Sequence, residues 1–418
     1  MYDFNVEISR FLKEEIGFTG LINAGNWKTA DQTKLLDAER YAYSATDVIG
    51  VNRYYGAREH VNPTENRKAG YLITKGDLIG GQSVLKQPNE FPLALRQVQG
   101  HPMIISESAW VPPLRYQSEG PPLVAAYSAL TGIDIFYWFK TNDIGFGPPM
   151  GKWQLSTPTQ IGMFPAAALM FREGYVQKGQ PVIIENRNLA DVWSRLSPLL
   201  PEAAGFDPNR DTRAQAAANN AVQPAGVTPL TYLAGSVQVA FQAGPNKIAD
   251  LSSLIDKQGN TARSITGELI WDQQQGISVV DTPKAQGITG DLRAARTISM
   301  RTLNVDSQNK YGSLLVVSMD GEDLTRSKKI LVQVGTTARP HGWKTSSTAG
   351  SKRRITALGS SPWNIENTNM KITLDNPSLT QATQLDANGL GISNVPITKT
   401  AHGIQLNAPQ DSMYLILQ

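Results

Sequence analysis

The chain has 418 residues, of which 40% are hydrophobic and 18% are charged. This size and composition predict a globular protein of two or three domains and exclude a single small domain. No stretch approaches the roughly 20 consecutive apolar residues that a membrane span requires. Lys and Arg number 39 against 36 Asp and Glu, so the formal net charge is +3, spread without blocks. This balance gives no electrostatic reason to expect nucleic acid or a membrane as a partner, and it favours an uncharged one.

Two rare residue types limit the chemistry open to the chain. There is no cysteine and there are only four scattered histidines, which excludes disulfides, thiolate metal sites and a cysteine nucleophile. We therefore expect no metal and no cofactor, and we expect any catalysis to use carboxylates, hydroxyls or lysine. The absence of cysteine fits a reducing cytoplasm or an exported bacterial protein. The start of the chain lacks the basic and then apolar segment of a signal peptide, so the localisation stays open.

The first part of the chain alternates helical and extended patterns in the rhythm of βα units. Apolar residues at three- and four-residue spacing predict an amphipathic helix at the start, ended by Gly17. In chain order, the expected elements are a helix at 4–16, a strand at 20–27, a helix at 31–44, a strand at 47–55, a polar excursion at 56–92, a short helix at 93–98, a strand at 101–110, a helix at 122–130, a strand at 133–139 and a helix at 164–172.

Beyond residue 180 the pattern changes to short β-branched runs separated by Gly, Asn, Asp and Pro, which is typical of antiparallel sandwiches. Segment 213–226 has no apolar period and predicts a surface loop. The clearest expected strands lie at 237–241, 276–281, 314–318, 329–334 and 413–417. We expect three domains, at residues 1–180, 181–295 (β-rich) and 296–418 (a C-terminal β-sandwich).

Glu107 ends the apolar strand expected at 101–110. The carboxyl ends of parallel strands are where βα loops assemble active sites, although a structural pairing of Glu107 with an arginine stays open as an alternative. The neighbouring strands also end in residues that suit sugar recognition, since aromatic rings stack on pyranose faces and amides bond hydroxyl groups. These residues are Asn26 and Trp27, then Asn52, Tyr54 and Tyr55, and then Trp138 followed by Asn142 and Asp143.

At these strand ends the sequence resembles the (β/α)8 glycoside hydrolases of the large retaining clan, similar to family 5, whose acid/base lies on strand four and whose nucleophile lies on strand seven. Asn26 and Trp27 correspond to strand five, residues 52–55 to strand six, residues 105–107 to strand seven and residues 136–138 to strand eight. The resemblance implies an α/β portion of a TIM barrel, strands five to eight, followed by all-β sandwich domains. It also implies retaining hydrolysis of O-glycosidic bonds in a neutral oligo- or polysaccharide, and a secreted or periplasmic bacterial location.

The resemblance assigns roles to individual residues. Glu107 would be the nucleophile, Tyr54 or Tyr55 the hydroxyl that bonds it, and Trp138 the platform under the sugar next to the cleaved bond. The substrate-binding residues that it implies are Asn26, Trp27, Asn52, Tyr54, Tyr55, Trp110 and Trp138.

A closed barrel needs about 250 residues, whereas this chain offers four βα units before the β-rich part. The acid/base of the clan would then lie upstream of Met1, because Asn89 and Glu90 precede a helix and not a strand end. We expect the missing half to lie upstream or to come from a partner, and the chain alone to self-associate. Two rivals remain, a non-catalytic carbohydrate-binding or surface protein with a depleted glycosidase cleft, and a structural β-module protein. Trp343 and Trp363 are expected in the sandwich core, and a carbohydrate-binding face on the β part stays open as the alternative for them.

Overall fold

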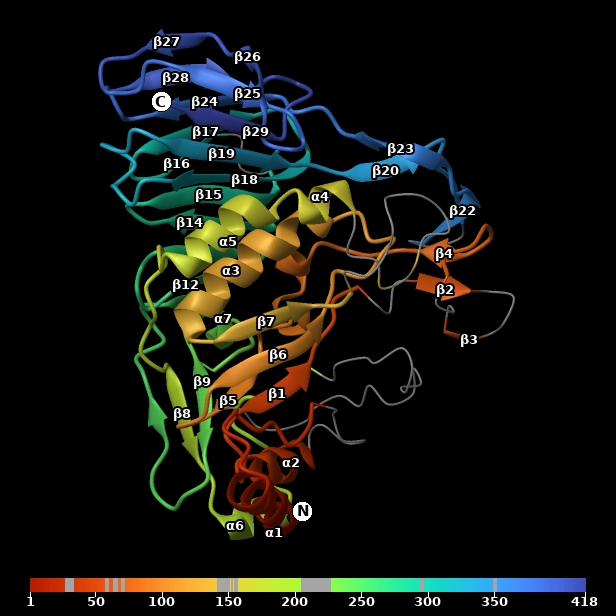
Figure 1. Ribbon diagram of the computed structural model, residues 1–418, viewed down its shortest axis with the longest axis vertical. Coiled ribbons are helices and arrows are strands. Elements are labelled where there is room, and N and C mark those ends of the chain that lie inside the picture. The colour runs from red at the N-terminus through yellow and green to blue at the C-terminus, as the bar shows by residue number, and fades with distance from the viewer. Residues whose placement is uncertain are drawn as a thin grey trace.

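The computed structural model describes residues 1–26, 34–56, 60–62, 67–68, 72–140, 151, 153, 157–203, 227–293, 297–348 and 352–418. These residues form a mixed α/β structure with few helices and many strands. A parallel sheet, a layer that holds helices α3 (Gly120–Thr131) and α5 (Phe164–Arg172), and then antiparallel sheets follow one another along the molecule (Figure 1). Trp27, Asn142, Asp143 and the loop expected at 213–226 lie outside the described residues.

The parallel sheet consists of β1 (Ile49–Asn52), β6 (Met103–Ser108) and β7 (Ile135–Trp138), in that order. Asn23 adds a parallel bridge to Val48 beside β1, so the strand expected at 20–27 is reduced to a bridge. The three strands lie side by side in the order in which they occur along the chain, as in βα units wound in one direction, although strands that belong to other sheets intervene between β1 and β6. In the part of the chain that is described, this sheet keeps open edges and does not close into a barrel.

Side chains of this sheet alternate between two different environments. Met103, Ile105 and Phe136 belong to the large core that includes α3 and α5. Ile135 and Tyr137 lie on the opposite face, where they are 42% and 53% exposed. The sheet is thus covered on its helical face and presents apolar side chains to solvent on the other.

The helical layer follows from local sequence signals. α5 coincides with the helix expected at 164–172, and α3 ends at Gly132, whose φ of 73° is the left-handed conformation of a glycine C-cap. None of the helices in the described ranges combines the length and the apolar character needed to cross a bilayer. The other helical segments are α1 (Tyr2–Arg10), the π-helical η1 (Phe11–Glu15), α2 (Leu36–Tyr43), the 3-10 turns η2 (Val84–Lys86), η3 (Pro88–Glu90) and η4 (Gln117–Glu119), α4 (Pro158–Ile161), α6 (Leu189–Trp193) and α7 (Thr231–Ala234).

A second sheet corrects the helix expected at 93–98. β5 (Arg96–Val98) is a strand that pairs in parallel with β9 (Val237–Ala240). β9 also pairs in parallel with β8 (Ile183–Asn186), and β10 (Lys247–Ile248) is antiparallel to β8. The helix prediction is wrong because β5 is fixed by partners distant in sequence, such as Val237 of β9 and Asp37 of α2, which leave no local pattern. This sheet crosses the expected boundary between residues 180 and 181.

Two antiparallel sheets form the β-rich part and share a core to which both contribute side chains. The ten-stranded sheet contains, in spatial order, β11 (Ile255–Asp256), β12 (Thr261–Arg263), β13 (Leu269–Asp272), β14 (Ile277–Asp281), β15 (Ala285–Asp291), β18 (Tyr311–Ser318), β19 (Ile330–Gly335), β29 (Tyr414–Leu417), β25 (Ala382–Leu385) and β26 (Gly391–Asn394). The five-stranded sheet contains β16 (Thr297–Ser299), β17 (Leu303–Ser307), β24 (Met370–Leu374), β28 (Ile404–Asn407) and β27 (Ile397–Lys399).

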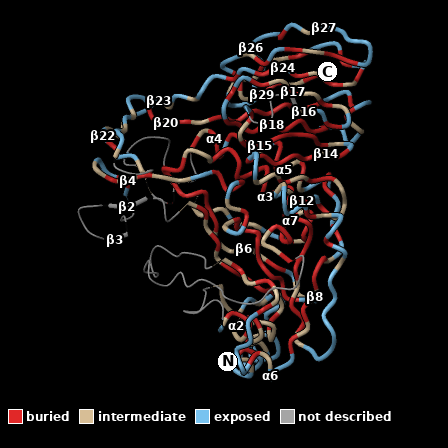
Figure 2. Tube along the Cα trace, turned by 180° about the vertical axis from the view of Figure 1, so that it is seen from behind, coloured by how far each residue is buried: buried red, intermediate tan, exposed pale blue. Residues whose placement is uncertain are grey.

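β18 links the β-rich part to the helical layer, because its side chains alternate between two cores. Leu314 and Val316 face the five-stranded sheet, while Leu315 and Val317 join the core that contains α5. Figure 2 shows the resulting buried run from β6 through α5 to β18. The expected strands at 276–281, 314–318, 329–334 and 413–417 are confirmed as β14, β18, β19 and β29, and that at 237–241 as β9. The ten-stranded sheet crosses the expected boundary between residues 295 and 296.

A smaller sheet brings the polar excursion at 56–92 against the C-terminal part. Ile73, Ile79 and Ile355 form its core, with Trp343 and Trp363 packed on it. Both tryptophans therefore lie outside the sandwich core in which they were expected. In spatial order the strands of this sheet are β21 (Lys344–Ser347), β22 (Arg353–Ala357), β4 (Leu78–Ile79), β2 (His60–Asn62) and β3 (Arg67–Lys68), and beside it β20 (Ala338–His341) pairs with β23 (Ser360–Ile365).

Candidate functional site

Glu107 lies near the carboxyl end of β6, beside β1. The hydroxyl of Tyr54 donates a hydrogen bond to Oε2 of Glu107 over 2.5 Å. The backbone N–H of Arg53 donates to the carbonyl of Glu107 over 2.9 Å. The register of β1 against β6 shifts between Val51 and Asn52, which places Asn52 opposite Glu107. One of the two tyrosines expected to bond Glu107 is therefore in contact with it.

Asn52 and Asn26 lie at the same end of the sheet. The hydroxyl of Ser106 donates to Oδ1 of Asn52 over 2.9 Å, and the backbone N–H of Asn52 donates to the carbonyl of Asn26 over 3.1 Å. Both asparagines are half-buried. The structure thus brings together Asn26, Asn52, Tyr54 and Glu107, because the carboxyl ends of parallel strands meet at one edge of a sheet.

Two aromatic residues that sequence reasoning missed hold the ring of Tyr54. The ring of Trp153 lies 4.8 Å from it, and Phe139, the residue after β7, meets it edge-to-face at 6.4 Å. Trp153 is only 4% exposed. The sequence around it carries no periodic pattern, so no sequence signal could have found it. This packing fixes the tyrosine ring and with it the direction of the hydroxyl toward Glu107.

Tyr55 and Trp110 are core residues, which corrects the expectation that both bind substrate. Trp110 is 0% exposed, and its Nε1–H donates to Glu119 over 3.1 Å. Tyr55 is 3% exposed, and its hydroxyl donates to the carbonyl of Gln82 over 2.8 Å. Successive side chains of an extended chain point to opposite faces. The residue after Tyr54 therefore points into the core and away from the open end of the sheet.

Trp138 is also turned toward the helical layer. Its ring lies 5.8 Å from that of Trp110, 4.9 Å from that of Phe136 and 5.2 Å from that of Phe164 in α5. It is in register with Ser108, at the same end of the sheet as Glu107. Only the part of its ring that remains exposed is available to a ligand. Trp27, the other expected platform, lies outside the described residues.

Glu119 is a buried carboxyl that sequence reasoning did not single out. It accepts hydrogen bonds from the Ser83 hydroxyl over 2.6 Å and the Val84 N–H over 2.8 Å, in addition to the bond from Trp110. Burial raises its pKa to about 7, although these hydrogen bonds favour the charged form. Because it ties η2 to η4 and to the segment after β6, we assign Glu119 a structural role.

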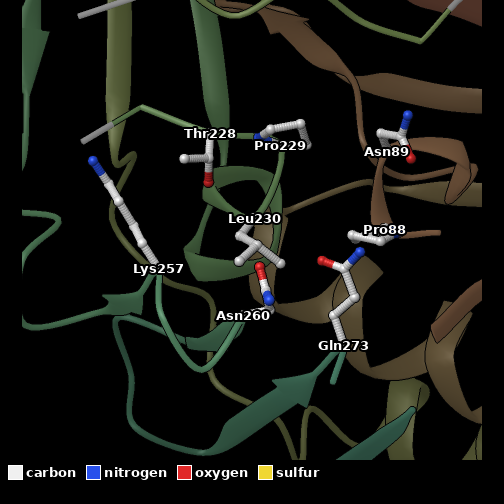
Figure 3. Close-up of a pocket in the computed structure, with 8 residues that line it drawn as sticks. All are labelled: Pro88, Asn89, Thr228, Pro229, Leu230, Lys257, Asn260 and Gln273. Atoms are coloured by element: carbon white, nitrogen blue, oxygen red, sulfur yellow. The ribbon is translucent and has the colours of Figure 1, made fainter. Parts of the chain in front are cut away.

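Asn89 lines a separate pocket of about 300 Å³, at the small end of the range for ligand pockets. Its lining residues are Pro88, Asn89, Thr228, Pro229, Leu230, Lys257, Asn260 and Gln273 (Figure 3). They come from η3, the segment before α7, the β11–β12 turn and the end of β13, and none comes from the parallel strands. Glu90 likewise lies in η3 and not at a strand end, as the sequence predicts.

Among the residues that the structure describes, no group of three or more His, Asp or Glu side chains is placed to hold a metal ion. Comparison with protein-family models, with curated proteins and with solved structures finds no match. The function must therefore be inferred from the side chains at the ends of β1 and β6.

Proposed function

We propose that Glu107 is the nucleophile of a retaining glycoside hydrolase that acts on an oligo- or polysaccharide. In the first step a carboxylate oxygen attacks the anomeric carbon, the bond to the leaving oxygen breaks, and an acid protonates that oxygen. In the second step water attacks the same carbon, the ester to Glu107 breaks, and the water proton passes to the group that acted as acid. Because Tyr54 holds Oε2, we assign the attack to Oε1.

The observation that carries the proposal is the hydrogen bond from Tyr54 to Glu107 at the ends of adjacent parallel strands. A hydroxyl donor stabilises the carboxylate in its charged form and fixes its orientation. The neighbouring amide of Asn52 is a suitable group for a sugar hydroxyl. The order of the bridge at Asn23, then β1, β6 and β7, supports their assignment as strands five to eight of a (β/α)8 barrel.

The acid/base carboxyl is assigned to further βα units that complete the barrel. In the described part of the chain, the hydrogen bonds of Glu107 involve Tyr54 and Arg53 and no second carboxylate. Parallel sheets occur almost only where both faces are covered. The exposure of Ile135 and Tyr137 therefore supports a further structural layer that covers this face of the sheet. α1 also exposes apolar side chains, such as Phe4.

Substitution of Glu107 tests the proposal. In the native assembly, with its open face covered, Glu107→Gln should lower hydrolysis of the preferred member of a panel of nitrophenyl glycosides and polysaccharides by several orders of magnitude. Saccharide binding should largely persist, because the amide keeps the volume of the side chain. Glu90→Gln is the matched control and should keep full activity. Full turnover by the Glu107→Gln variant would overturn the proposal.

A non-catalytic carbohydrate-binding protein is the second candidate, favoured by the same lack of a second carboxylate among the described contacts of Glu107. In that case the wild-type assembly binds saccharide and hydrolyses no member of the panel. The Glu107→Gln variant then changes affinity alone.

A further inference from the structure

The pocket beside η3 is separate from the ends of the parallel strands. Its volume of about 300 Å³ corresponds to about ten water molecules, which suits a small ligand of one or two rings. Pro88 and Gln273 line one side of it in Figure 3, and Thr228 lines the other. The buried side chain of Leu230 lies between the two sides.

Thr228 brings a hydroxyl group whose hydrogen-bonding capacity is unused. Its side-chain oxygen is buried and has no hydrogen-bond partner among the described residues. The backbone of Thr228 is held in place, because its N–H donates to Oγ1 of Thr231 over 3.2 Å and its carbonyl accepts from the N–H of Thr231 over 2.9 Å. Figure 3 shows the hydroxyl turned toward Leu230. A ligand that bonds this oxygen removes the free-energy cost of leaving it unpaired.

Gln273 offers an acceptor on the opposite side of the pocket. Its Nε2 donates to the carbonyl of Lys86 over 3.3 Å, and the amide oxygen is turned toward Asn260 and Leu230 (Figure 3). An amide oxygen can only accept, whereas the ammonium group of Lys257 can only donate. The described residues that line the pocket therefore call for a ligand that both donates and accepts.

The turn between β11 and β12 holds two further polar groups in position. Oδ1 of Asp256 accepts hydrogen bonds from the backbone N–H groups two and three residues further on, over 3.0 and 3.1 Å. Asn260 has a φ of 50°, and its carbonyl accepts from the N–H of Gln273 over 3.0 Å. The backbone that carries Lys257 and Asn260 is thus fixed before a ligand arrives, which lowers the entropy lost on binding.

We propose that this pocket binds one neutral sugar unit of a saccharide. Hydroxyl groups donate and accept, so neighbouring hydroxyls of one ring can bond Gln273 and Thr228 together. Pro88 and Leu230 supply apolar contact for the carbon atoms of the ring. An inorganic anion suits Lys257 but leaves the amide oxygen of Gln273 without a donor. A cation finds no acidic side chain among the described residues of the lining.

This site goes beyond the proposed function, because none of the residues that line it comes from β1, β6 or β7. It is a second place at which the protein holds a saccharide, and it does not depend on the role of Glu107.

NMR titration of the 418-residue chain with labelled leucine methyl groups tests the proposal at the pocket itself. The signals of Leu230 are assigned by their loss in a Leu230→Ile variant. The probes are the methyl glycosides of glucose, galactose, mannose and xylose, with sodium phosphate as the anion and triglycine as the amide. We expect at least one glycoside to shift the Leu230 signals with a Kd on the order of 1 mM, and phosphate and triglycine to leave them unchanged.

Variants of the polar lining identify the groups that bind the sugar. Thr228→Val removes the hydroxyl, keeps the shape of the side chain and should weaken binding roughly fivefold or more. Thr228→Ser restores the hydroxyl and should keep most of the affinity, which guards against a change of fold as the cause. Asn260→Gly removes the amide, suits a φ of 50° and should weaken binding to a similar extent. Thr380→Val, at an exposed threonine outside the pocket, is the control and should bind as the wild type does.

Four results would overturn the sugar pocket. They are no shift of the Leu230 signals with any glycoside, a shift by phosphate or triglycine at lower concentration than by every glycoside, an unchanged Kd in both Thr228→Val and Asn260→Gly, and an equal loss in the Thr380→Val control. Glu107→Gln should leave the titration unchanged. Failure of the pocket and failure of the nucleophile assignment are thereby distinguished.

Discussion

Tyr54 and Tyr55 are consecutive residues with opposite environments. The hydroxyl of Tyr54 bonds Glu107 at the open end of the sheet, and its ring rests on Trp153. The hydroxyl of Tyr55 bonds the carbonyl of Gln82 inside the core. Because successive side chains of an extended chain point to opposite faces, Tyr54 lies at the site and Tyr55 packs in the core.

Phenylalanine substitutions separate the two roles. Tyr54→Phe should lower turnover about tenfold or more and change the free energy of unfolding by less than about 0.5 kcal/mol, because only a partly exposed hydroxyl is removed. Tyr55→Phe should destabilise the fold by about 1 kcal/mol and leave turnover intact, because the Gln82 carbonyl loses its donor. Urea unfolding and glycoside hydrolysis measure both effects. The same loss of turnover in the two variants would contradict the assignment.

Glu119 makes the free energy of unfolding depend on pH. Its pKa is about 7 in the folded protein and returns to about 4.5 on unfolding. The folded state therefore binds the proton more tightly. Its contribution to stability is complete below about pH 4.5 and is lost as the pH rises through about 7, and for a fully buried carboxyl it amounts to about 3 kcal/mol.

Glu119→Gln removes this titration and keeps the side-chain volume. Between pH 5 and pH 8 the wild-type protein should lose more unfolding free energy than the variant, by an amount on the order of 3 kcal/mol. Urea unfolding of both proteins at the two pH values provides the comparison, in which groups common to both cancel. Parallel pH profiles would show that Glu119 is ionised in the fold across this range.

At the scale of elements, a buried ion-pair cluster joins segments that are distant in sequence. Arg96 of β5 bonds Asp37 of α2 over 2.5 Å, and Glu202 pairs with Arg40 of α2 and with Arg53 beyond β1. Burial opposes the charge of Glu202, but Arg40 and Arg53 prevail and lower its pKa to about 2. Its stabilisation is present above about pH 4.5 and is lost as the pH falls through about 2.

Glu202→Gln should destabilise the fold by about 3 kcal/mol at pH 7, because it leaves Arg40 and Arg53 buried without their carboxylate. Glu322→Gln is the matched control. It breaks an exposed pair with Arg326 and should change the stability by less than about 0.5 kcal/mol. Chemical denaturation measures both. If Glu202→Gln destabilised the fold as little as the control does, water or a structural rearrangement would have to stabilise the charges of Arg40 and Arg53 in place of the carboxylate.

Elements with a local signal could be predicted from the sequence. The apolar spacing at 164–172 and the short apolar run at 133–139 correspond to α5 and β7. β5 could not, because Arg96 is fixed by Asp37 and by pairing with Val237. At the site, strand ends located Glu107 and its neighbours. The side of the sheet toward which Trp110 and Trp138 point could not be predicted, because the register of β6 against β7 shifts after Ile105.

At the scale of the whole molecule, one face of the parallel sheet is packed and the other presents apolar side chains. Phe136 belongs to the large core, while its neighbours Ile135 and Tyr137 are exposed. Open sheet edges in the described part of the chain lie beside this face. Such surfaces promote association between copies when nothing covers them.

The chain alone should therefore associate as its concentration rises and should bind a hydrophobic dye. The double change Ile135→Ser and Tyr137→Ser should reduce both effects at little cost in stability. Phe136→Ser, between them, should instead destabilise the fold by about 2 kcal/mol, because it removes a partly buried ring that packs against the core. Light scattering and dye fluorescence measure association. A wild-type chain that stays monomeric and binds no dye would contradict the uncovered face.

The most direct test of the central claim is to trap the ester on Glu107. A panel of 2-deoxy-2-fluoroglycosyl fluorides in the gluco, galacto, manno and xylo configurations is applied to the native assembly, since a fluoride leaves without help from an acid. Intact-mass measurement followed by peptide mapping then locates the label. We predict one glycosyl label, carried by Glu107 and absent from the Glu107→Gln variant. A label on any other residue, or none with all four sugars, would contradict the assignment of Glu107 as the nucleophile.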